Sequence, residues 1–317
     1  MNNSKIAFLF PGQGAQYIGM GLDFIEQDSA LKQIITDFDN KNNTNLYEIM
    51  QNGPEEKLKE TRFTQPAILF HSIAAMRALL KQIGIKPDFV AGHSLGEFSA
   101  LVANGVIDFA DALYLVHKRG EFMIKANDGS DFAMAAIIGP DQQLVREKCE
   151  IASETGIVVP ANFNTPVQTV ISGSKVGVDK ACELLSEAGA KRVVPLVVGG
   201  PFHSPMISKA GEWLSEEMNK IQFSSTNIPV ISNVDAKEAN EPEKIKDNLV
   251  KQITSSVLWV DCVRNMIDQG VELFIEFGPQ KVLSGMMRKI DRKAKILNID
   301  KIADIEKVIE YIQNQVK

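Results

Sequence analysis

The sequence predicts an α/β fold in which a small α+β domain is inserted into a larger α/β domain. Its 317 residues suit about two domains. With 44% hydrophobic and 23% charged residues, the chain has the composition of an ordinary globular protein, which excludes a disordered or fibrous chain. Strand-like and helical segments alternate in the first half, as in an α/β sheet, and the middle of the chain follows a different order.

Apolar runs and helical periodicity predict the elements of the large domain. We expect strands at 6–10 and 89–91, a buried helix at 67–82 and a helix at 108–126. An amphipathic helix is expected at 302–316, where it would close the fold. The charge-free stretch at 63–76 contains Gln, Pro and His, which favours a buried helix over a membrane span.

The middle of the chain predicts a ferredoxin-like α+β domain. Its expected order is βαββαβ, with strands at 132–138, 157–162, 168–172 and 192–198 and helices at 141–153 and 176–188. The expected division is therefore a large domain at 1–129 and 199–317 and a small one at 130–198. A cleft between two domains is the default place for a ligand.

Charge and cysteine content narrow the class of protein. A net charge of -6 argues against nucleic acid as the main partner, because phosphate binding needs a dominant basic surface. The three cysteines, Cys149, Cys182 and Cys262, stand far apart and indicate neither a metal site nor a disulfide framework. With an N-terminal apolar run of only 6–10, too short for a signal peptide, a cytoplasmic location is expected.

The segment Gly-His-Ser-Leu-Gly-Glu at 92–97 contains the candidate nucleophile, Ser94. Gly-x-Ser-x-Gly between a strand and a helix is typical of a nucleophile elbow, in which a tight turn exposes the serine hydroxyl. Because this motif is typical of α/β-hydrolases, we expect the large domain to be α/β-hydrolase-like. The backbone N–H groups of the following helix would face a developing oxyanion. The alternative is an accidental glycine-rich turn.

Four histidines are available as the base that a serine requires. His93 adjoins Ser94 on a tight turn, and His71 and His117 lie within predicted helices, so packing roles are favoured for all three. His203 follows a strand and precedes Ser-Pro at 204–205, a pattern typical of a helix start. A helix N-terminus would keep its imidazole neutral; the alternative is a loop histidine without a role.

Arg119 is the candidate cation for a carboxylate ligand. Its helical neighbours three and four positions away are Leu115, Val116, Phe122 and Met123. A guanidinium on such an apolar stripe needs a negative partner from a ligand or another element, because a buried unpaired charge is costly. The alternative, a structural ion pair, is equally open from spacing alone.

The glycine-rich loop after the first strand, at 10–21, fails the nucleotide-binding patterns. Tyr17 occupies the third glycine position of Gly-x-Gly-x-x-Gly, and Met20 stands where a phosphate loop needs Lys. Such a turn can still contribute a backbone N–H to an oxyanion hole, and Gln13 is the natural donor.

Four motifs together resemble one family. With Pro-Gly-Gln-Gly at 11–14, Gly-His-Ser-Leu-Gly-Glu at 92–97, His-Lys-Arg-Gly at 117–120 and Pro-Phe-His-Ser at 201–204, the chain closely resembles the bacterial malonyl-CoA:acyl carrier protein transacylases. The likeness covers essentially the full length. It includes Thr-Gln-Pro at 64–66, Asn-Phe-Asn at 162–164, Asn-Val-Asp at 233–235 and Phe-Gly-Pro at 277–279.

The resemblance implies a role for each matching residue. Ser94 would carry the acyl group, His203 would be its base, and Arg119 would bind the malonyl carboxylate. The backbone N–H groups of Gln13 and Leu95 would form the oxyanion hole. Gln252 matches a position that helps orient the histidine in place of an acidic residue, and Asn162 matches a site-lining asparagine. The implied reaction moves malonyl from malonyl-CoA to acyl carrier protein through a covalent ester, with no metal or redox cofactor and no membrane.

Other functions share parts of this pattern. A serine hydrolase or thioesterase could use the same elbow, a scaffold protein could bind the carrier without catalysis, and a transacylase of a polyketide or malonate decarboxylase system would look similar. Fatty acid synthesis is favoured because no synthase segment is fused to the chain. An acidic carrier needs a basic docking face; the candidate clusters are Lys281, Arg288, Lys289, Arg292, Lys293 and Lys295, and Lys191 with Arg192.

Overall fold

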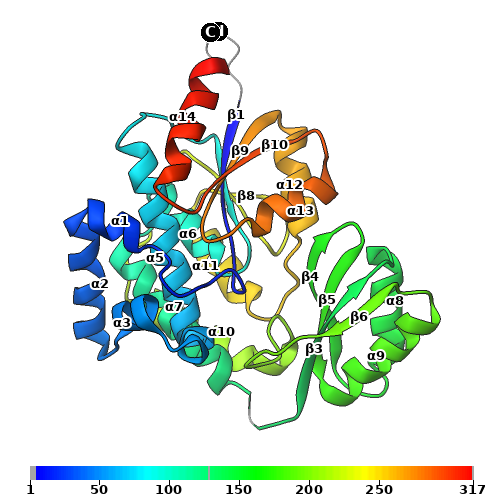
Figure 1. Ribbon diagram of the computed structural model, residues 1–317. Coiled ribbons are helices and arrows are strands. Elements are labelled where there is room, and N and C mark those ends of the chain that lie inside the picture. The colour runs from blue at the N-terminus through cyan, green and yellow to red at the C-terminus, as the bar shows by residue number, and fades with distance from the viewer. Residues whose placement is uncertain (1–4, 128, 316–317) are drawn as a thin grey trace.

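The computed structural model describes residues 5–127 and 129–315, which form a mixed α/β fold with two sheets (Figure 1). The larger sheet has the strand order β10-β9-β1-β2-β7-β8. All neighbouring strands in it are parallel except β7 and β8. The strands are β1 (Lys5–Phe10), β2 (Phe89–Gly92), β7 (Val230–Ile231), β8 (Glu238–Ala239), β9 (Val271–Phe277) and β10 (Lys295–Ile299).

Both faces of the larger sheet are buried, as a parallel sheet requires. Phe8 and Phe10 of β1 belong to a core shared with most of the helices, and Ala7 and Leu9 face a second core. The first face is covered mainly by α1 (Leu22–Gln27), α2 (Ser29–Asn42), α3 (Leu46–Asn52), α4 (Glu55–Lys59), α5 (Thr61–Leu80), α6 (Gly96–Ala103), α7 (Phe109–Lys125), α10 (Ser208–Met218), α11 (Pro242–Gln252) and α14 (Ala303–Gln315). The second is covered by α12 (Trp259–Asp268) and α13 (Val282–Ile290).

The smaller sheet lies to one side of the molecule and has the order β4-β5-β3-β6, with all its neighbours antiparallel (Figure 1). Its strands are β3 (Phe132–Ile138), β4 (Val158–Thr165), β5 (Gln168–Ser174) and β6 (Arg192–Pro195). Ala135 and Ile137 pack with α8 (Gln142–Ala152) and α9 (Lys175–Glu187) in a separate core. Because strand side chains alternate, Met134 and Ala136 join the core of the larger sheet.

The predicted strands and helices form at the expected places, with differences at their ends. The helix expected at 67–82 begins six residues earlier, at Thr61, and therefore contains Pro66. Proline lacks the N–H that would bond to the carbonyl of Arg62. The ring Nδ1 of His117 lies 2.9 Å from that carbonyl and supplies the missing donor. The structure thereby gives His117 the packing role expected for it.

Two further segments depart from the predicted ends. β6 ends at Pro195, not at 198, and residues 196 and 198 instead line a pocket. The C-terminal helix spans Ala303–Gln315, and residue 316 of the predicted helix lies outside the described residues. Within 5–127 and 129–315, no helix combines the length and apolar character needed to cross a membrane.

Candidate active site

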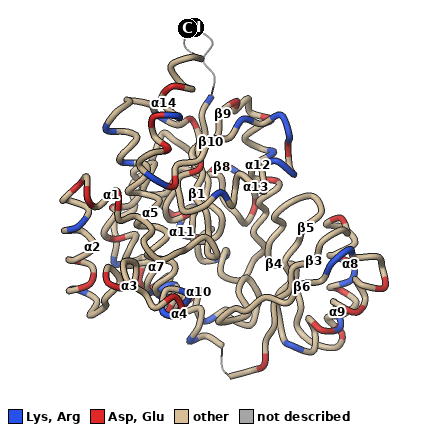
Figure 2. The backbone as a smooth tube through the Cα atoms, viewed as in Figure 1, with Lys and Arg blue, Asp and Glu red and all other residues tan. Residues whose placement is uncertain are grey.

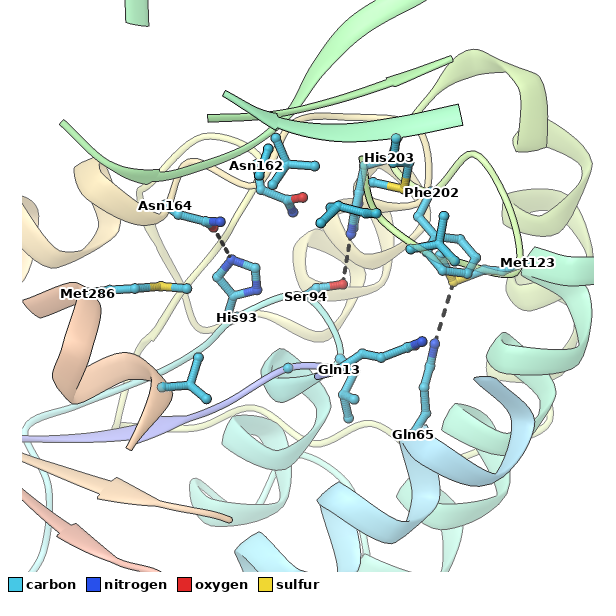
Figure 3. Close-up of a pocket in the computed structure, with 18 of the residues that line it drawn as sticks. Gln13, Gln65, His93, Ser94, Met123, Asn162, Asn164, Phe202, His203 and Met286 are labelled. Atoms are coloured by element: carbon cyan, nitrogen blue, oxygen red, sulfur yellow. Dashed lines mark hydrogen bonds between the residues drawn. The ribbon is translucent and has the colours of Figure 1, made fainter. Parts of the chain in front are cut away.

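A cavity of about 300 Å³ contains most of the residues singled out in the sequence (Figure 3). Six of the seven predicted site residues line it, namely Gln13, Ser94, Leu95, Arg119, Asn162 and His203. Gln252, the seventh, is fully buried and outside the lining. Gln13 and Ser94 follow the adjacent parallel strands β1 and β2, whose carboxyl ends meet at one edge of the sheet, the usual place for a ligand in such folds.

Ser94 occupies the turn between β2 and α6 in a strained backbone conformation. Its φ is 51°, a left-handed value that a non-glycine residue adopts only where the surroundings enforce it. The two flanking glycines make the turn possible. A Cβ on Gly92 would lie 1.9 Å from the carbonyl of Gly96, and a Cβ on Gly96 would lie 2.1 Å from the carbonyl oxygen of Phe10. The local structure is therefore the elbow that the motif predicts.

The ring of His203 forms a hydrogen bond with the hydroxyl group of Ser94. Its Nε2 lies 2.8 Å from Ser94 Oγ, and its Nδ1 lies 2.8 Å from the backbone carbonyl of Gln252. Because a carbonyl only accepts, Nδ1 must carry the ring proton. Nε2 of the neutral ring is then the acceptor for the serine hydroxyl. The pair has the geometry of a nucleophile and its general base.

The environment keeps His203 neutral, but for a different reason from the one the sequence suggested. Burial, with a further contribution from the charge of Arg119, lowers the pKa of His203 to about 3. The expected helix start is a three-residue 3₁₀ helix, Pro205–Ile207, preceding α10. Ser204 does not cap it with its side chain, and its Oγ instead donates to the carbonyl of Pro201. The helix start expected at Ser204 and Pro205 is therefore present as a 3₁₀ turn, but burial and Arg119 are the causes that lower the pKa of His203.

Arg119 extends from α7 into the same site and is only 1% exposed. Its guanidinium donates to Ser94 Oγ at 3.0 Å, to Gln65 Oε1 at 2.8 Å and to Gln252 Oε1 at 2.9 Å. All three partners are neutral. Burial lowers the pKa of Arg119 to about 10, against the opposing effect of Glu97, so the cation persists at neutral pH. A buried cation held by neutral groups at a pocket wall is suited to an anionic ligand.

Gln252 connects the base and the cation. Its backbone carbonyl orients His203, as described above, and its side-chain oxygen accepts from Arg119. Asn162, on β4, is 8% exposed and lines the cavity from the side of the smaller sheet. Gln13 and Leu95 line it next to the elbow.

Two residues of the site had no role assigned from the sequence. Gln65 accepts from Arg119, and its Nε2 lies 3.7 Å from the sulfur of Met123. Asn233 accepts the backbone N–H of Ser94 at 2.7 Å and donates to the carbonyl of Gly92 at 2.7 Å, so its side chain ties the elbow together. Both stand in short motifs, at 64–66 and 233–235, but spacing alone could not connect them to Ser94 and Arg119.

Of the two remaining histidines, His93 lines the cavity, and His71 is buried outside its lining. His93 Nε2 lies 2.8 Å from Asn164 Oδ1, and its ring contacts that of Trp259 edge-on. His71 is fully buried, and its Nε2 lies 3.4 Å from Asp300. Burial lowers the pKa of both rings.

Comparison with known proteins identifies the family and agrees with the mixed α/β fold. The acyl transferase domain family matches residues 7–314. A malonyl CoA-acyl carrier protein transacylase of Bacillus subtilis is 44% identical over 313 residues, which is 98% of each chain. An acyl carrier protein S-malonyltransferase of Vibrio cholerae, solved at 1.7 Å, is 42% identical with a TM-score of 0.92, covering 96% of this chain and 100% of that one.

A third relative was solved together with a carrier protein. This malonyl-transacylase, in complex with a type II PKS acyl-carrier protein, is 37% identical with a TM-score of 0.92, covering 97% of this chain and 100% of that one. The fold and the matches define an acyltransferase. The chain belongs to the acyl transferase family, among its malonyl CoA-acyl carrier protein transacylases.

Proposed function

We propose that this protein transfers a malonyl group from malonyl-CoA to the phosphopantetheine thiol of acyl carrier protein through an ester on Ser94. One observation carries the proposal. Ser94 Oγ lies 2.8 Å from His203 Nε2 and 3.0 Å from the guanidinium of Arg119. A base and a carboxylate-binding cation therefore meet at one nucleophile.

In the first half-reaction, Ser94 Oγ attacks the thioester carbonyl carbon of malonyl-CoA. His203 Nε2 takes the hydroxyl proton as the C–O bond forms. The tetrahedral intermediate places its negative charge on the former carbonyl oxygen, where the backbone N–H groups of Gln13 and Leu95 would stabilise it. When the C–S bond breaks, the imidazolium returns its proton to the CoA thiolate. The product is a malonyl ester of Ser94.

In the second half-reaction, the thiol of the carrier's phosphopantetheine takes the place of CoA. His203 removes the thiol proton, and the sulfur attacks the ester carbonyl. The C–O bond to Ser94 then breaks, and His203 gives the proton back to Ser94 Oγ. The two acceptors use one site in turn, which is ping-pong kinetics.

Arg119 would select the acyl group. A malonyl group has a free carboxylate one methylene away from its reacting carbonyl, so a cation that contacts Ser94 Oγ in the free site is within reach of that carboxylate. The planar guanidinium can bind it through two parallel hydrogen bonds. Gln65 and Gln252 would hold the guanidinium in place, which fixes the carbonyl at attack distance. Asn162 would border the acyl group from the opposite wall.

The basic cluster at 281–295 is our proposed docking surface for the acidic carrier (Figure 2). Its six cations, introduced above, are all exposed. The cluster includes both ends of α13, whose Leu283 and Met286 line the cavity. A carrier bound there would have its pantetheine arm near the pocket mouth, and complementary charge would speed the encounter. The pair Lys191 and Arg192 is the second candidate.

We further propose the division into a large α/β-hydrolase-like domain at 1–129 and 199–317 and a ferredoxin-like domain at 130–198. Residues 1–4, 128, 316 and 317 of this division lie outside the described residues. The βαββαβ order of the small part and its separate core support the division. The free state of all three cysteines is consistent with the expected cytoplasmic location.

Measuring both possible fates of the acyl group tests the proposal against the serine hydrolase alternative. We expect transfer of malonyl to holo-acyl carrier protein to be much faster than release of free malonate. Fast hydrolysis without transfer would contradict it. Carriers from fatty acid and polyketide synthesis, compared as acceptors, separate the two pathways; we expect the fatty acid carrier to be preferred.

A further inference from the structure

Glu97 is a buried carboxyl group that the proposed reaction does not use. It lies in the first turn of α6, three residues after Ser94, and is 2% exposed. Burial raises its pKa to about 7. A carboxyl group in such a place is costly unless it is fully hydrogen-bonded. Its contacts therefore indicate what it does.

The Oε2 atom of Glu97 accepts two hydrogen bonds from residues that hold the site. One comes from Gln252 Nε2 at 2.8 Å and the other from the backbone N–H of Asn233 at 3.1 Å. Each donor residue also forms hydrogen bonds with residues of the site. Gln252 reaches Arg119 and His203, and Asn233 reaches the backbone of Ser94.

The contact with Gln252 decides which way its amide faces. Gln252 Nε2 is surrounded by three acceptors, namely Glu97 Oε2 at 2.8 Å, the carbonyl of Ser94 at 3.0 Å and Asn233 Oδ1 at 3.2 Å. The carboxylate is the strongest of these acceptors because it is the one that can carry charge. With Nε2 fixed there, Oε1 of Gln252 points to Arg119 and accepts a hydrogen bond from its guanidinium. The opposite orientation would place two donors, the amide and the guanidinium, against each other.

We propose that Glu97 is a positioning residue that fixes the amide of Gln252, and through it Arg119, and so sets the preference for acyl groups that have a free carboxylate. This inference rests on the proposed function. Glu97 touches neither substrate nor the reacting atoms. Its effect on the acyl group passes through Gln252, and its effect on the elbow passes through Asn233.

Two substitutions separate the acceptor from the rest of the side chain. Glu97→Met has similar length and no acceptor oxygen, whereas Glu97→Gln retains one acceptor oxygen for both donors. The control is Glu276→Met. Glu276 is a second fully buried carboxylate, but its partners are the backbone N–H groups of Leu283 and Ser284 and the hydroxyl of Ser284.

The measurement is kcat/KM for malonyl-CoA and for acetyl-CoA, each with holo-acyl carrier protein, together with the rate of acyl-enzyme formation by intact mass. For Glu97→Met we expect malonyl-CoA use to fall about tenfold or more, as expected for loss of a hydrogen bond to a charged group, mainly through KM. Acetyl-CoA use should change much less. Glu97→Gln should restore the malonyl-to-acetyl ratio to near the wild-type value, and Glu276→Met should leave the ratio unchanged.

An equal loss for both donors in Glu97→Met would overturn the proposal, because a purely structural role predicts it. A ratio changed as much in Glu97→Gln as in Glu97→Met would overturn it too. If Glu97→Met does not fold, Glu97→Asp provides the same test, since its carboxylate ends one methylene short of Gln252, and we expect the same selective loss. Failure of the wild-type enzyme to transfer malonyl would instead overturn the proposed function.

Discussion

The Nε2 of His203 lies 2.8 Å from Oγ of Ser94, although the two residues are 109 positions apart in the chain. Both have a left-handed backbone, with φ values of 57° and 51°. Such conformations are strained and persist only where surrounding contacts enforce them. Asn233 holds the backbone of Ser94, and the carbonyl of Gln252 holds the ring of His203. The proposed nucleophile and its proposed base are therefore in position before any substrate binds.

Removal of the Arg119 guanidinium should affect one substrate selectively. In Arg119→Ala we expect kcat/KM for malonyl-CoA to fall roughly 30-fold to several thousand-fold, which corresponds to the roughly 2–5 kcal/mol lost with one partner of a buried charged contact, while acetyl-CoA use falls much less. Steady-state kinetics with both donors checks this. Lys118→Ala is the matched control, because Lys118 pairs with Glu121. Equal impairment of both donors by Arg119→Ala would identify a structural arginine.

The neutral state of His203 predicts the pH dependence of acylation. Its pKa is lowered from 6.5 to about 3, and the base is lost only when the ring is protonated. The rate of malonyl-enzyme formation in a rapid-quench experiment should therefore show no loss with a midpoint near 6.5 and should fall only at much lower pH. Repeating the profile in Glu97→Gln removes the other site group whose pKa lies near neutrality. An acid limb near 6.5 in both proteins would contradict this account.

The buried carboxyl of Glu97 predicts a pH-dependent contribution to stability. Burial raises its pKa from 4.5 to about 7, so between these values the folded protein keeps a proton that the unfolded chain releases. The contribution is complete below 4.5 and is lost as pH rises through 7, in total roughly 3 kcal/mol. Urea unfolding measures this at pH 5 and pH 8. Between these pH values the free energy of unfolding of the wild type should fall by about this amount relative to that of Glu97→Gln. A pH-independent difference would contradict burial of the carboxyl.

Alanine should have opposite effects at two glycines, one in the elbow and one in an open helix position. In Gly96→Ala the new Cβ would lie 2.1 Å from the carbonyl oxygen of Phe10, which requires the backbone to move, so we expect a loss of several kcal/mol or failure to fold. Gly285, within α13, has nothing within 4 Å of its Cβ position. Gly285→Ala should stabilise the protein by roughly 0.5–1 kcal/mol. Thermal unfolding of both variants checks the pair, and a mild effect of Gly96→Ala would rule out the close approach.

Residues with a strong local signature could be predicted from the sequence. Ser94 stands in a motif that dictates its own turn, and the periodicity around Arg119 already placed the guanidinium on an apolar face. The start of α5 could not be predicted, because Pro66 normally opens a helix. The donor that makes a helical Pro66 tolerable, His117, comes from α7, and no local rule includes it.

The connections of the site were likewise beyond sequence reasoning. Gln252, Asn233 and Glu97 lie on separate segments. Their roles follow from which atom the amides of Gln252 and Asn233 present to each neighbour, and from the acceptor oxygen of Glu97. The low pKa of His203 arises from burial and from Arg119, both of which depend on the completed fold. A helix end was the only local explanation that the sequence offered.

Intact-mass spectrometry after mixing with malonyl-CoA tests most directly whether Ser94 carries the acyl group. We expect a gain of one malonyl group in the wild type, its absence in Ser94→Ala, and its removal when holo-acyl carrier protein is added. Ser99→Ala is the matched control, because Ser99 is a fully buried serine of α6 outside the cavity lining, and it should still form the adduct. An adduct that persists in Ser94→Ala, or none in the wild type, would contradict the covalent mechanism.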